Sequence, residues 1–175
     1  MKNAAIFFLV FCPMVFWVSC ASSSLLLQND DNSEQSEQTY KISFLAYGPG
    51  TPVGETRSIA GHASLSIDGP GVYGFYPDIP GKLISKQGQL KYSTEYPINQ
   101  LYTDFLVSEN TRNKILELIA KWENTPPPFI LPANDCVSFI YRVCDVIGLK
   151  YDPFILLPTN AIRAIRIFNV HDKVY

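Results

Sequence analysis

The chain has no excess of positive charge, few histidines and no cysteine spacing typical of metal sites. Its 175 residues carry 14 Lys and Arg against 16 Asp and Glu, a net charge of -2. The basic stripe that nucleic-acid binding requires is therefore missing. Two histidines and four cysteines without CxxC or HxxxH spacing do not make a set of metal ligands. We expect no nucleic-acid partner, no metal and no cofactor.

Long apolar runs are also scarce, and the run at the N-terminus is short for a membrane span. Met1 and Lys2 precede an apolar run over residues 4–18, and small residues, "SCASSS", follow it. A span needs roughly 20 apolar residues, so residues 1–20 are interpreted as a signal peptide that is removed. "WVSC", ending at Cys20, resembles the bacterial lipobox, although Trp17 stands where that motif normally carries Leu.

The lipobox resemblance implies a lipid on Cys20, which would anchor the mature protein to a membrane. Ala21 stands where a retention signal would place Asp, and by resemblance this favours the outer membrane. We therefore expect an exported, periplasmic lipoprotein. Ordinary secretion, with cleavage near Ala21 or Ser23, is the alternative.

Residues 21–39 form a polar segment around one small apolar island, too little to bury for its ordering entropy. We interpret this segment as a flexible tether. The folded part is then one domain over residues 40–175, because a chain of this size can bury one good core.

Alternating apolar residues predict strands in the first half of this domain. "YKISFLAYGP", residues 40–49, predicts one strand, and residues 59–67 predict a second. "DGPG" at 68–71 predicts a turn, and "VYGFYP" at 72–77 a return strand. In the second strand one face carries Ala63, Leu65 and Ile67, and the other carries His62, Ser64 and Ser66. His62 is thus expected in mid-strand.

Helical spacing predicts two helices in the second half. Residues 107–124, "VSENTRNKILELIAKWEN", have Ser108 as a candidate N-cap and end before three prolines. Residues 132–152, "PANDCVSFIYRVCDVIGLKYD", have Asn134 or Asp135 as the cap and Gly148 as the end. The apolar residues of the second helix span most of its surface, which predicts that it is largely buried.

Cys136 lies in the first turn of the second predicted helix. Unpaired N–H groups and the helix dipole favour an anion there, so we expect the pKa of this thiol below the roughly 8.5 of a free cysteine. Cys144 lies eight residues later, about 12 Å along the helix, whereas a disulfide needs Cα atoms within roughly 7 Å. Cys136 should therefore be a free thiol, and Cys144 a buried small hydrophobe.

"GHASLSI", then "GFYP", and far downstream "NDCVSFIYRVCDVIGL" resemble the circularly permuted branch of the NlpC/P60-like, papain-like cysteine hydrolases. In that branch the His strand precedes the Cys helix. The resemblance covers roughly residues 40–168. It implies an α+β fold in which an antiparallel sheet packs on the Cys-bearing helix.

The resemblance also implies roles for site residues. Cys136 is the expected nucleophile and His62 its base, and a third polar residue on the next strand would orient the imidazole. If Ile67 pairs with Tyr73, Asp78 lies opposite His62, and a one-residue shift puts Pro77 there instead. Asp78 is the expected third residue, with Tyr76 and Asp68 as alternatives.

The expected function is a cell-envelope thiol hydrolase that acts by acyl transfer. The first expected substrate is an amide bond in peptidoglycan stem peptides. One alternative is an acyl ester or lipid, and another is a non-catalytic binding or adaptor lipoprotein of the same fold. His171, in the polar segment "NVHDKVY", is interpreted as a surface residue.

Overall fold

A computed structural model describes residues 38–53, 56–95 and 101–175. The expected signal peptide, the lipidation at Cys20 and nearly all of the expected tether fall outside these ranges. The described residues belong to one compact unit, Ser36–Tyr175. None of the helices within the described ranges is long and apolar enough to cross a membrane.

The centre of the unit is a five-stranded antiparallel sheet with the strand order β7-β5-β4-β1-β8. Its strands are β1 (Thr39–Tyr47), β4 (His62–Ile67), β5 (Val72–Pro77), β7 (Gly88–Ser93) and β8 (Leu101–Ser108). Two small sheets flank it, one of β2 (Pro52–Val53) with β3 (Thr56–Arg57) and one of β6 (Ile84–Ser85) with β9 (Phe129–Ile130).

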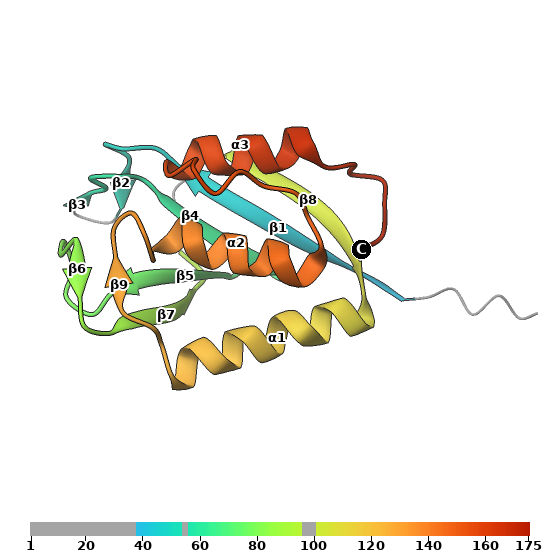
Figure 1. Ribbon diagram of the computed structural model, residues 1–175, viewed down its shortest axis with the longest axis horizontal. Coiled ribbons are helices and arrows are strands. Elements are labelled where there is room, and N and C mark those ends of the chain that lie inside the picture. Colours follow the sequence, from blue (N-terminus) through green and yellow to red (C-terminus); the bar gives the residue numbers. More distant parts are fainter. Residues whose placement is uncertain (1–37, 54–55, 96–100) are drawn as a thin grey trace, which may run out of the picture. The chain divides into compact units, whose positions relative to one another are not determined.

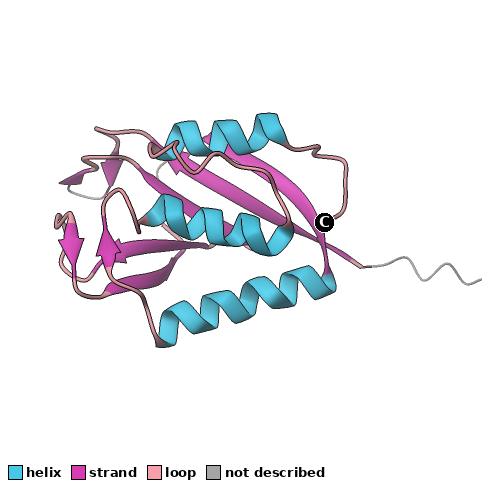
Figure 2. Cartoon of the chain, viewed as in Figure 1, coloured by secondary structure: helices cyan, strands magenta, loops and turns pink. Residues whose placement is uncertain are grey.

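Three helices pack on one face of the five-stranded sheet, so the fold is α+β as expected (Figures 1 and 2). They are α1 (Glu109–Asn124), α2 (Cys136–Ile147) and α3 (Pro158–Phe168). The core lies between the helices and this face. Ala63 and Leu65 of β4 are buried there, while Ser64 is on the other face, which confirms the predicted alternation.

The caps of both predicted helices are confirmed. The Ser108 hydroxyl accepts a hydrogen bond from the N–H of Thr111 at the start of α1. Asp135 caps α2, and Gly148 ends it with a left-handed φ of 82°. The ends of both helices could be predicted from the sequence, because the capping residues lie where the regularly spaced apolar residues of the helix begin and end.

His62 is the first residue of β4, so the prediction that it lies in mid-strand is wrong. Gly61 precedes it with a φ of +83°, and a Cβ on Gly61 would lie 2.3 Å from the Tyr47 carbonyl oxygen. The backbone therefore turns at Gly61, and Ile59, which continues the alternation in sequence, is 73% exposed in a loop. His62 consequently lies at the end of the sheet where β4 begins and β1 ends, rather than over its centre.

Of the remaining predictions on individual residues, the prediction of two free cysteines is confirmed and the one for His171 differs from the structure. Cys136 and Cys144 are both free thiols, and Cys144 is fully buried, as expected. His171 was expected at the surface, but it is half-buried and stacks on Phe105 with ring centroids 4.9 Å apart. Its ring nitrogens lie 3.1 and 3.0 Å from the carbonyl oxygens of Asp104 and Arg166, which fixes the C-terminal segment against β8 and α3.

Candidate active site

The N-terminus of α2 is fixed by a capping box. Oδ1 of Asp135 accepts hydrogen bonds from the N–H groups of Val137 at 3.0 Å and Ser138 at 3.1 Å. The Ser138 hydroxyl in turn accepts from the N–H of Asp135 at 3.2 Å. These bonds hold the first turn of the helix, and with it Cys136, in one position.

Cys136 lies where strands β4 and β5 separate. The two strands pair at Ser64 with Gly74 and at Leu65 with Tyr73, and the ladder stops before Ala63. The N–H groups of Ala63, Cys136 and Val137 each act to lower the pKa of the Cys136 thiol. The opening of the sheet therefore brings the helix thiol next to the residue that follows His62.

His62 is held between two tyrosines. Continued by two residues, the β4–β5 register places His62 opposite Tyr76, and the two rings stack with centroids 4.3 Å apart and planes 17° apart. Tyr47, the β1 partner of His62, lies on another side with its ring centroid 5.8 Å away. Gly74 leaves room for the imidazole, since a Cβ there would lie 2.5 Å from His62 Nε2. Stacking and close packing thus fix the position of the ring.

The predicted pairing of His62 with Asp78 is wrong. Leu65 rather than Ile67 pairs with Tyr73, because the turn between the strands is longer than expected and includes Asp68 at a φ of 46°. Asp78 lies beyond β5, where its carboxylate accepts from the N–H of Ile79.

Asp68, an alternative third residue, follows the far end of β4 and bonds to Arg112 and to the N–H of Lys41. Of the three candidates for the third residue, Tyr76 is the one whose side chain the structure brings to His62.

Burial determines the protonation of the two central groups. It lowers the pKa of His62 to about 3. Burial, and secondarily the Asp135 carboxylate, raises the pKa of Cys136 to about 12 against the opposing effect of the nearby N–H groups. The expected lowering of the thiol pKa is therefore wrong, because desolvation of a buried thiolate outweighs the helix N-terminus. Both groups are neutral at pH 7.

Two buried polar atoms of the site have no hydrogen-bond partner among the described residues: His62 Nε2 and Asp135 Oδ2. An unsatisfied buried polar atom costs on the order of 1–3 kcal/mol. Burial also raises the pKa of Asp135. Such atoms are uncommon in folded proteins, and these two belong to residues that line the same cavity as Cys136.

A cavity of about 620 Å³ joins these groups. Its polar side is formed by Tyr47, His62, Tyr76, Asp135 and Cys136. Apolar walls are formed by Phe75, Phe129, Leu131, Leu156 and Pro158. The volume is in the range of small-molecule sites, and the apolar walls with a few convergent polar groups are typical of them.

Two residues of the site were missed from the sequence. Gly74 could have been identified from the sequence, because an isolated glycine inside a strand pattern indicates that another group approaches the backbone closely. Tyr47 could not have been identified in this way, since its contact with His62 depends on the pairing of β1 with β4.

Comparisons of the chain with protein-family models, with curated proteins and with solved structures find no match in any of the three.

Proposed function

We propose that the chain is a thiol hydrolase that transfers an acyl group to Cys136, with His62 as the proton acceptor. The observation that supports this most strongly is the shared cavity, which is lined by a thiol at a helix N-terminus and by a buried imidazole whose Nε2 has no partner among the described residues. A purely structural site would leave the cost of that unpaired atom without compensation. The resemblance of the two motifs to papain-like hydrolases supports the same roles.

In the proposed reaction the Cys136 sulfur attacks the acyl carbonyl while its proton passes to His62. A ring nitrogen of His62 would accept this proton, and Nε2 is the one that has no hydrogen-bond partner among the described residues. Transfer within a neutral pair avoids a buried ion pair before substrate enters. The N–H of Cys136 would stabilise the oxyanion, because Asp135 occupies the N–H groups of Val137 and Ser138.

Collapse of the tetrahedral intermediate would form a thioester on Cys136, and His62 would return the proton to the leaving amine or alcohol. Water would then attack the thioester, lose a proton to His62 and release the acid, while the thiol takes the proton back.

The first proposed substrate is an amide of a peptidoglycan stem peptide, which follows from the expected export and from the family resemblance. The apolar walls favour a second candidate, an acyl ester, because Phe129, Leu131 and Leu156 offer apolar surface to a hydrocarbon chain. Both substrates would use the same acyl-transfer chemistry.

Mass spectrometry of purified cell-wall fragments and of a panel of acyl esters, each incubated with the protein, tests the proposal. We expect one class to be consumed by the wild type and by Cys144→Ala, but not by Cys136→Ala. Turnover that survives in Cys136→Ala would refute the role of this thiol. Consumption of neither class, with a folded wild type, would favour the adaptor alternative.

A further inference from the structure

The mouth of the active-site cavity carries exposed aliphatic side chains. Ile59 is 73% exposed, Leu83 53% and Leu156 45%, and all three line the cavity. They come from three separate connections, β3–β4, β5–β6 and α2–α3. Phe154, two residues before Leu156 on the last of these loops, is 88% exposed. Scattered exposed apolar residues are ordinary, but a group around one opening is typical of an interaction site.

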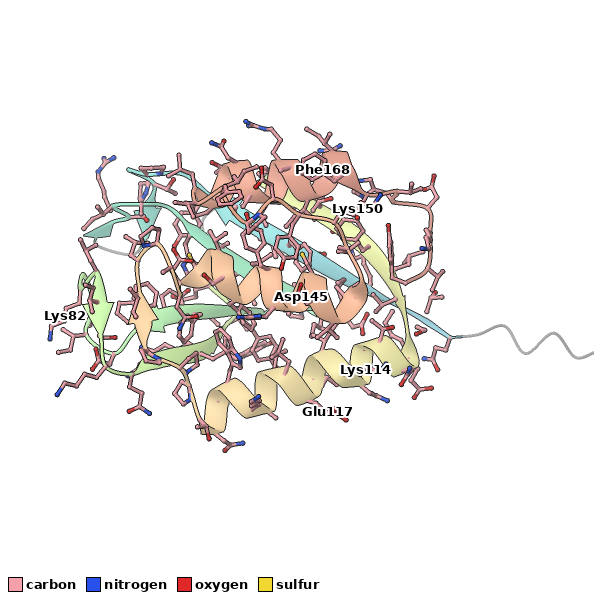
Figure 3. The ribbon with its side chains drawn as sticks, in the orientation of Figure 1. Lys82, Lys114, Glu117, Asp145, Lys150 and Phe168 are labelled. Carbon is pink, nitrogen blue, oxygen red and sulfur yellow. The ribbon has the colours of Figure 1, made fainter. Side chains whose placement is uncertain are left out.

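The same mouth carries basic side chains. Arg57, Lys82 and Lys91 are exposed and line the cavity, and Asp135 is the one acidic side chain among the described residues that line it. Asp135 is 1% exposed, so it contributes no acidic surface. The exposed charged residues that line the cavity are therefore mainly basic, whereas the whole chain has a net charge of -2. Figure 3 shows Lys82 at the end of the molecule that carries β6, away from Lys114 and Glu117 on α1.

We infer that the mouth of the cavity, defined by Ile59, Leu83, Leu156, Arg57 and Lys82, docks on the surface of an anionic lipid bilayer. Aliphatic tips on loops can enter the boundary between headgroups and acyl chains without unfolding any helix or strand. Lys and Arg around them bind a surface of uniform negative charge. An anionic bilayer can bind both kinds of side chain around the opening, because its headgroups are negatively charged and the acyl chains beneath them are apolar.

Docking in this orientation would let an acyl chain pass from the bilayer into the cavity without crossing water. The chain would then lie along the apolar walls that lead to Cys136. The docking itself involves neither Cys136 nor His62, so it does not rest on the proposed chemistry. A Cys136→Ala variant should dock as the wild type does.

Tryptophan quenching by brominated lipids tests the docking in the full chain. Trp17 is replaced by Phe, which leaves Trp122, 8% exposed, as the background. Leu83→Trp reports on the mouth, and Ile167→Trp, at a position 72% exposed on α3, is the matched control. Both variants share the same N-terminal segment, so any anchoring by that segment affects them equally.

Vesicles of phosphatidylcholine with or without about 30% phosphatidylglycerol provide the two surfaces. We expect strong quenching of Leu83→Trp on the anionic vesicles, weak quenching on the neutral ones, and little quenching of Ile167→Trp on either. Arg57→Gln with Lys82→Gln should lower the ratio of docked to undocked protein on the order of 30-fold. The control pair Lys114→Gln with Lys121→Gln, on α1, should leave it unchanged.

Equal quenching of Leu83→Trp and Ile167→Trp, or none of Leu83→Trp, would overturn the inference. Quenching of Leu83→Trp that is the same on both vesicles, or unaffected by loss of Arg57 and Lys82, would refute the anionic preference. Either result would leave the proposed hydrolase chemistry standing, because Cys136→Ala and the substrate assay test it separately.

Discussion

Replacement of Gly74 by Ala tests whether the imidazole is held where the structure places it. The added Cβ would lie 2.5 Å from His62 Nε2 and 2.7 Å from the Tyr76 hydroxyl. Neither ring can move freely, because they stack on each other and Tyr47 lies beside His62. Overpacking of this kind costs about 1–3 kcal/mol. In a domain of this size that lowers Tm by roughly 3–12 °C.

A thermal melt of Gly74→Ala beside Gly69→Ala measures this cost. Gly69 is the matched control, since a Cβ there would lie 3.6 Å from its nearest neighbour, an ordinary contact. In a double-mutant cycle, Gly74→Ala should cost less in a His62→Ala background than in the wild type, because the clash with Nε2 is gone. Equal Tm values for the two glycine variants, or no coupling with His62, would refute the placement of the imidazole over Gly74.

Three further predictions follow from burial and capping at the site and in the core. Cys144→Ala should lower the free energy of unfolding by about 1–2 kcal/mol in a urea titration, because it leaves a small cavity, and should leave turnover unchanged; equal stability would contradict the full burial of Cys144. Burial lowers the pKa of His62 from 6.5 to about 3, so between these values the unfolded chain binds a proton that the folded chain does not. The free energy of unfolding should therefore fall on acidification from pH 6.5 towards 3 by up to about 1.4 kcal/mol per pH unit, and His62→Phe should show a shallower fall; identical profiles would contradict a neutral buried His62. Asp135→Asn should keep the helix cap but remove a charge that raises the pKa of Cys136, so alkylation of Cys136 should be faster at pH 9 with a similar Tm; an unchanged alkylation rate would contradict the influence of Asp135.

The helices show what could be predicted from sequence and why. The bounds of α2 follow from Asp135, Gly148 and a hydrophobic stripe, all of which are local signals. The missed helix α3 has the same kind of signal, with Pro158 at its start and Ala161, Ile162 and Ile165 buried at helical spacing. It could therefore have been predicted by the same reasoning.

The site depends on features that are not local. The register between β4 and β5 depends on how many residues the turn at Asp68 takes up, and that number placed Tyr76 rather than Asp78 beside His62. A register error of this kind changes which residues face each other while the alternation remains correct.

The protonation of the site was harder still to predict. Position at a helix N-terminus lowers a thiol pKa, but the sequence does not show that Cys136 is only 6% exposed. Burial of the thiol depends on helix α2 packing where β4 and β5 separate, a feature of the assembled sheet. The direction of the pKa shift of Cys136 could therefore be determined only from the structure.

The most direct test of the proposed chemistry is the rate at which an activated acyl ester acylates Cys136, followed by intact-protein and peptide mass spectrometry. Cys136→Ala and His62→Ala are compared with the wild type, and Cys144→Ala is the control thiol variant. The proposal predicts an acyl group on Cys136 of the wild type and of Cys144→Ala, none in Cys136→Ala, and acylation at least about 100-fold slower in His62→Ala. An acyl group on another residue, or acylation of folded His62→Ala at nearly the wild-type rate, would contradict it.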